Sequence, residues 1–232
     1  MVASLASGSS ADDDVTEQLW LDYHGHFHLS PVWEYYGDTG FRTDLHEWQK
    51  LYIRPSFRLH SQRRAIEGRG GIGLFYTHND TIDNQLELRP WVGTFIKWPR
   101  LGPLTIINYL RLEARFVWDT DNWELDKSLR FRYKLGTKIP LKRGEKLKYF
   151  YVPISAEWFE DVTPPVTEVF AEDWRFDVGL GHIFSKEMVG EFHFIVQRSR
   201  TTPDETFVTD DFAFRFVVKR LWSTRDYMSQ DS

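Results

Sequence analysis

Every second residue between Leu104 and Trp118 is apolar with one exception, and the residues between them are largely polar or charged. The first set reads Leu104, Ile106, Asn108, Leu110, Leu112, Ala114, Phe116 and Trp118. The second set reads Thr105, Ile107, Tyr109, Arg111, Glu113, Arg115 and Val117. Successive side chains of a β-strand point to opposite faces, so this segment predicts a strand with one greasy and one polar face.

The same two-sided pattern returns along most of the chain, in segments of roughly 10 to 16 residues, which is long enough to cross an outer membrane at a tilt. The segments are residues 18–29, 45–60, 64–78, 85–98, 104–118, 123–137, 147–159, 173–184, 189–198 and 207–222. This repetition predicts an all-β fold: a transmembrane antiparallel up-and-down β-barrel of ten strands with a polar lumen.

The strand count has an alternative. Residues 32–42, with Trp33, Tyr35, Tyr36 and Phe41, are either an external loop or an additional strand. Bacterial barrels of this class have an even number of strands, so an additional strand here predicts a twelfth, near residues 166–170. Any even count returns both chain ends to the same side of the membrane, and we therefore expect both termini to be periplasmic.

Three prolines, Pro55, Pro90 and Pro153, lie inside the expected strands. Proline has no amide hydrogen to donate, and a closed barrel has no free edge where the missing donor would be harmless. A β-bulge at each proline is the expected solution.

Composition alone resembles that of a soluble protein, with 27% charged residues and a mean hydropathy of -0.46. No run of about 18 apolar residues exists, which excludes a helical membrane protein. The aromatic content of 16% is high, and aromatic side chains are favoured at membrane interfaces. Seven tryptophans fall near the ends of the expected strands, as an interfacial girdle requires: Trp20, Trp98, Trp118, Trp123, Trp158, Trp174 and Trp222.

A ten-strand lumen is too narrow to hold the apolar row of every strand, so we expect that row to face lipid. The strands are also longer than those of a typical sandwich. A soluble lipid-binding barrel, with the apolar row turned inward, is the alternative.

The chain is expected to divide into three parts. Residues 1–11 end in a run of small residues and are interpreted as the residual end of a signal peptide or a disordered tail. Residues 12–222 are expected to form a single outer-membrane barrel, and residues 223–232 a periplasmic tail.

Similarity to a known family is distributed over most of residues 18–222. The segments that carry it are QLWLDY (18–23), GIGLFYT (71–77), LELRPW (86–91), YLRLEARF (109–116), FRYKLG (131–136) and GEFHFIVQRSR (190–200). They resemble a family of Gram-negative outer-membrane β-barrels whose function is unknown. This resemblance implies a barrel fold and a bacterial outer-membrane location, but no catalytic residues. Residues 212–222 also resemble the assembly signal that normally ends such chains.

The inward face is expected to be dense in charges of both signs, which we call the luminal charges. They are Arg54, Arg58, Glu67, Arg69, Glu87, Arg89, Arg111, Glu113, Arg115, Arg130, Arg132, Glu157, Arg175, Asp177, Glu191 and Arg215, with Glu124 on the same expected face. Neighbouring strands could pair these ions and satisfy one another structurally. Their excess of arginine could alternatively form a narrow pathway for small anions.

His24, His26 and His28 form the one compact cluster with metal-ligand character. Residues i and i+2 of a strand project to the same side, so two of these imidazoles could bind one ion with a neighbouring carboxylate. With 0 cysteines, no thiolate site exists. Structural histidines of a polar lumen are the alternative, and no cofactor is expected.

The function most consistent with this sequence is non-enzymatic: a narrow or plugged, porin-like channel for small polar or anionic solutes, or a structural barrel of the envelope. A barrel enzyme that modifies envelope lipids or polymers is the alternative. Outer-membrane lipids, and a small polar solute, are the expected partners. Nucleic acid is not expected, because the net charge is -5 and the basic residues are spread over many strands.

Overall fold

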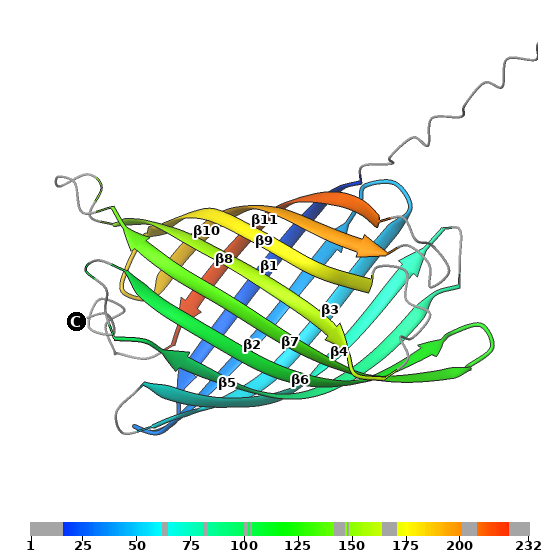
Figure 1. Ribbon diagram of the computed structural model, residues 1–232, viewed down its shortest axis with the longest axis horizontal. Coiled ribbons are helices and arrows are strands. Elements are labelled where there is room, and N and C mark those ends of the chain that lie inside the picture. Colours follow the sequence, from blue (N-terminus) through cyan, green and yellow to red (C-terminus); the bar gives the residue numbers. More distant parts are fainter. Residues whose placement is uncertain are drawn as a thin grey trace, which may run out of the picture.

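The computed structural model describes residues 16–61, 65–80, 83–99, 102, 104–141, 147, 149–163, 171–200 and 208–222. These residues form eleven strands that close into a barrel (Figure 1). The strands are β1 (Glu17–His28), β2 (Trp33–Thr43), β3 (Trp48–His60), β4 (Ile66–Asn79), β5 (Gln85–Lys97), β6 (Thr105–Asp119), β7 (Leu125–Pro140), β8 (Phe150–Asp161), β9 (Ala171–Ile183), β10 (Met188–Arg200) and β11 (Val208–Leu221). No helix in these ranges is long and apolar enough to cross a membrane.

Each strand pairs antiparallel with the next along the chain, and the barrel closes between its first and last strands. This closing pair is parallel, with Glu17 opposite Phe212 and His26 opposite Leu221. Both β1 and β11 therefore begin at one mouth of the barrel and end at the other. In Figure 1, β1 begins at the right end of the barrel and β11 runs beside it toward the left.

The expected strand counts of ten and twelve are both wrong. Residues 32–42 correspond to β2, which pairs with β1 and β3 over its whole length. The twelfth strand expected near residues 166–170 lies outside the described residues. Because the count is odd, β1 begins and β11 ends at opposite mouths, so the even-count argument that brought both ends to one side does not apply.

The expected bulges at the three prolines are also wrong. Pro55 pairs with Gly37, Pro90 with Ile72 and Pro153 with Lys138, so each proline keeps its place in the sheet on one side. On the other side the pairing is interrupted and then resumes in the same register. A proline lacks only one donor, and a local gap in one of its two ladders accommodates that loss without an extra residue. A register shift in the sheet lies elsewhere, between Arg198 and Ser199.

The two faces of the wall have the orientation that the alternation predicts. Large apolar side chains such as Leu51, Ile72, Val92 and Phe214 are exposed on the outside, with relative exposures between 41% and 63%. The buried side chains are dominated by charged and polar groups, which point into the lumen. The described lumen is therefore not the greasy cavity that a soluble lipid carrier requires.

Two residues depart from their expected places. Trp20, assigned to the outer aromatic girdle, points into the lumen and is 1% exposed. It lies on the same face of β1 as Asp22 and His24, so the alternation itself assigns it to the interior. Glu124, expected in the lumen, lies in the exposed turn after β6.

The turn between β2 and β3 is held by one carboxylate. Asp44 Oδ1 accepts hydrogen bonds from the backbone amides of His46, Glu47 and Trp48 at 3.0, 2.9 and 3.0 Å. Leu45, inside this turn, has φ 70°, a left-handed conformation that disfavours residues with a Cβ. The hydrogen bonds of Asp44 thus stabilise a turn that its own sequence strains.

Candidate functional site

The densest group of buried charges centres on Glu113, which is 0% exposed. Arg111 Nε, Arg132 Nη1 and Arg130 Nη2 approach its carboxylate oxygens to 2.7, 2.8 and 2.9 Å, and Arg89 Nη1 to 3.5 Å. The four arginines come from β5, β6 and β7, because alternate residues of adjacent strands share the inward face. Hydrogen bonds between two charged partners are about twice as strong as neutral ones, and those from Arg130 and Arg132 join Glu113 of β6 to β7. Arg89 adds a longer ion pair from β5.

Two further glutamates, Glu87 and Glu157, extend the same network. Glu87 contacts Arg89 Nη2 and Arg115 Nε, each at 2.7 Å, and Glu157 contacts Arg132 Nη2 at 2.7 Å and Arg175 Nη1 at 3.6 Å. Each of the three carboxylates is shared by two or more guanidinium groups, so arginines outnumber glutamates in the network. We call these three glutamates with Arg89, Arg111, Arg115, Arg130, Arg132 and Arg175 the Glu113 network.

Aromatic rings cover several of these guanidinium groups. Arg111 Cζ lies 4.0 Å from the ring centroid of Trp91, and Arg89 Cζ lies 4.3 Å from that of Phe75. A ring face attracts a cation, and it occupies space that water would otherwise fill. The aromatic residues of the inner row therefore shield part of the network from water.

A second group of charges surrounds Glu34 of β2, near the mouth at which β1 ends. Its carboxylate oxygens lie 2.7 Å from His26 Nδ1, 2.9 Å from His60 Nε2, 3.5 Å from Arg58 Nη1 and 4.0 Å from His28 Nδ1. Glu34 is 2% exposed. One carboxylate from β2 thus connects the histidine row of β1 with β3.

The predicted histidine site is not assembled as a metal centre in the described residues. His24 donates to or accepts from the Tyr36 hydroxyl at 2.8 Å, whereas His26 and His28 turn toward Glu34. Among the described residues, the group whose ligand atoms lie close enough for one ion is instead Asp83, Asp119 and Asp121, in neighbouring turns. Exposed acidic groups of this kind are common without a metal.

A third group lies on β9, β10 and β11. His193 Nδ1 is 2.6 Å from Asp177 Oδ1 and its Nε2 is 3.0 Å from Glu191 Oε2, so the imidazole is held between two carboxylates. Lys219 Nζ lies 2.6 Å from Glu191 Oε2, and the Tyr151 hydroxyl donates to the same side chain. All hydrogen-bonding capacity of this histidine is directed at structural partners within the wall.

Every one of the predicted luminal charges except Glu124 points inward in the structure. Which carboxylate each arginine contacts was not predictable, because partners depend on the register between strands. The sequence analysis missed Asp22, Glu34, Asp38 and His60 as members of the lumen. Asp22 and His60 lie on the polar faces of expected strands, which is a usable signal. Glu34 and Asp38 lie in β2, where the sequence permits either a loop or a strand.

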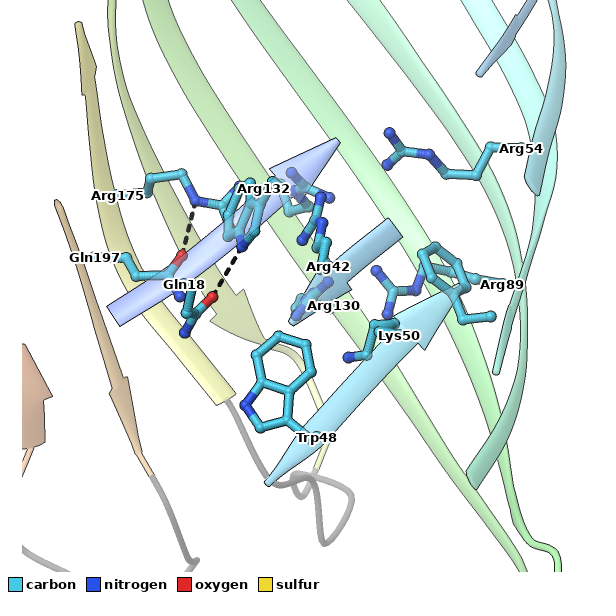
Figure 2. A pocket seen from close by; sticks show the side chains of 12 residues that line it. Gln18, Arg42, Trp48, Lys50, Arg54, Arg89, Arg130, Arg132, Arg175 and Gln197 are labelled. Atoms are coloured by element: carbon cyan, nitrogen blue, oxygen red, sulfur yellow. Dashed lines mark hydrogen bonds between the residues drawn. The ribbon is translucent and has the colours of Figure 1, made fainter. Parts of the chain in front are cut away.

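The described residues enclose a small cavity in the lumen, near the mouth at which β1 begins. Its volume is about 50 Å³. Of the twelve described residues that line it, seven are cations, six arginines and one lysine, and none is acidic. In Figure 2, the charged ends of Arg42, Arg130 and Arg132 point into it, with Lys50 on one side and Trp48 at its outer end.

Comparison with known proteins gives a family without an assigned activity. No curated protein matches the chain. A family model described as "protein of unknown function (DUF2490)" matches residues 17–208, which extends from the first residue of β1 to the first residue of β11. The match covers most of the barrel, and the chain therefore belongs to the DUF2490 family of proteins of unknown function.

Proposed function

We propose that this protein is an outer-membrane β-barrel of non-enzymatic type whose lumen is plugged by its own side chains. The observation that carries the proposal is the inverted distribution of polarity, with apolar side chains outside and charges inside. A continuous apolar surface around a protein is unfavourable in water, and it is the property that a lipid-facing barrel requires.

Contacts across the lumen support a plug rather than an open pore. The Arg175 guanidinium of β9 lies 4.8 Å from the Trp20 ring of β1, and the Tyr52 hydroxyl of β3 donates to Asp22 of β1 at 2.6 Å. Neither pair belongs to adjacent strands. Together with the buried Glu113 network, these contacts occupy much of the interior among the described residues, beside the small cavity near one mouth.

Membrane association is tested by expressing the full chain with its own or a replacement signal sequence and fractionating the cells. We expect the protein in the outer-membrane fraction, resistant to extraction by alkaline buffer and by urea. Recovery in detergent-free buffer as a folded, monodisperse species would overturn the membrane assignment.

Planar-bilayer recording tests the plug. We expect the reconstituted wild type to show no steady conductance. The double variant Arg132→Ala/Glu157→Ala removes an ion pair of 2.7 Å and keeps the net charge, so it should open a small conductance if the pair blocks the lumen. A steady conductance of the wild type would contradict the plug, and a silent double variant that is folded would show that this pair does not close the path.

A further inference from the structure

The small luminal cavity has a composition that a structural plug does not require. Its cations come from distant parts of the chain: Arg42 of β2, Lys50 of β3, Arg130 of β7 and Arg175 of β9. Pairing between neighbouring strands alone would place carboxylates beside cations. Instead, the cationic ends converge on one space, and none of the described residues that line it is a carboxylate.

Three of the lining arginines bind glutamates that are not part of the lining. Arg89 binds Glu87, Arg130 binds Glu113, and Arg132 binds Glu113 and Glu157. None of these glutamates lines the cavity. Like charges that face a common space repel one another, and an anion placed between them would lower that repulsion. The guanidinium group, with several donors in one plane, is well suited to the oxygens of a phosphate.

Uncharged donors and a fixed aromatic ring complete the lining. Gln18 accepts a hydrogen bond from Trp20 Nε1 at 2.9 Å, and Gln197 accepts one from Arg175 Nε at 3.2 Å, which leaves the amide groups at the edge of the cavity (Figure 2). Both amides also donate to Asp211 Oδ2, at 3.3 and 3.4 Å. Arg42 stacks on Trp20 with its Cζ 3.9 Å from the ring centroid, which fixes the direction of its donors.

Size limits the ligand. A water molecule requires roughly 10 to 15 Å³ of such volume, so a cavity of about 50 Å³ holds a few waters or one tetrahedral oxyanion. A sugar or a nucleotide does not fit inside, but the terminal phosphate of a larger molecule could enter from the mouth while the rest stays outside.

We propose that this cavity binds a single phosphate-type oxyanion, either as the free anion or as the terminal phosphate of a larger molecule that enters at the mouth where β1 begins. The site goes beyond the plug described above. The site is formed by residues of the lumen alone, so binding can be measured in detergent whether or not the membrane assignment holds.

The test is a titration of the detergent-solubilised full chain with inorganic phosphate, in which calorimetry measures the heat of binding. We expect saturable binding that Arg130→Gln and Lys50→Gln each weaken by about tenfold or more, since each removes one charge from the lining. Arg58→Gln is the matched control, because Arg58 is a luminal arginine bound to Glu34 that does not line the cavity, and it should leave the affinity unchanged.

Arg130→Gln leaves Glu113 with three arginines and should fold, and Lys50→Gln carries the test if it does not. Absence of saturable binding to the wild type, or equal weakening by Arg58→Gln, would overturn the proposal. Competition then identifies the source of the phosphate. Displacement by micelles of a phosphomonoester lipid, but not of a phosphocholine lipid, assigns the site to a headgroup; displacement by neither assigns it to the free anion.

Discussion

The Glu113→Gln substitution tests the central claim that the lumen is held together by shared carboxylates. Glu113 is 0% exposed and lies within 3.5 Å of four guanidinium groups. Arg89 and Arg132 keep Glu87 and Glu157 as partners after the change. Arg111 and Arg130 have no other carboxylate partner among the described residues, so two buried cations lose their counter-charge.

Removing one member of a buried ion pair typically costs about 3 to 5 kcal/mol, because the remaining charge stays desolvated. We therefore expect Glu113→Gln to lower the free energy of unfolding by about 3 to 5 kcal/mol. The assay is denaturant unfolding of the reconstituted protein, monitored through tryptophan fluorescence. Glu124→Gln, in an exposed turn, is the control and should change the stability by less than about 0.5 kcal/mol.

The double variant Glu113→Gln/Arg130→Gln separates lost pairing from a general packing defect. Because it removes one of the two cations that Glu113→Gln leaves without a partner, its loss should be smaller than the sum of the single losses, with a coupling of about 1 kcal/mol or more. A loss below about 1 kcal/mol for Glu113→Gln, or strict additivity in the double variant, would refute the reasoning.

Three further predictions address the turns and the outer face. Leu45→Gly relieves a φ of 70° and should raise the stability by about 0.5 to 1 kcal/mol, whereas Val32→Gly, in a turn without this strain, should not; thermal unfolding measures both. Phe214→Lys places a charge in the middle of the outer row of β11 and should cost about 2 to 4 kcal/mol in a bilayer, while Phe214→Leu should cost clearly less; a negligible cost for the lysine would argue that this face does not meet lipid. Hydrogen bonds with Asp119 and Asp121 raise the pKa of Asp83 to about 6, so the folded state holds this proton more tightly than the unfolded chain. Its stabilising effect is present below the unfolded pKa of 3.8 and is lost as the pH rises through 6, a dependence that Asp83→Asn should remove from thermal unfolding curves; an unchanged pH dependence would contradict it.

The sequence alone predicts the barrel, its two faces and most of its strands, because a β-strand places alternate side chains on opposite sides wherever it lies in the fold. The sequence permits either a loop or a strand for β2, because glycines interrupt the alternation of its side chains. A Cβ at Gly37 would meet the Tyr35 hydroxyl, and one at Gly40 would meet Asp22 and Tyr52. These positions are small because side chains from the same or neighbouring strands lie over them, which is a property of the assembled wall and not of the local sequence.

The luminal partners were not predictable for a related reason. The four arginines around Glu113 are brought together by the registers of β5, β6 and β7, and a shift of one residue would turn each of them outward. Likewise, the cavity combines residues from β1, β2, β3 and β10, which meet only after the barrel closes. Composition indicates that charges must pair, but the pairing itself is a result of closure.

The parallel contact between β1 and β11 has a consequence for the order of folding. Other neighbouring strands are consecutive along the chain, so each can form as a hairpin as soon as its two strands exist. The closing contact joins Glu17 to Phe212, nearly the whole chain apart, and parallel pairs are slightly less stable per residue. This seam can form only once both terminal strands are present, and its backbone amides should be the first in the wall to exchange with deuterium.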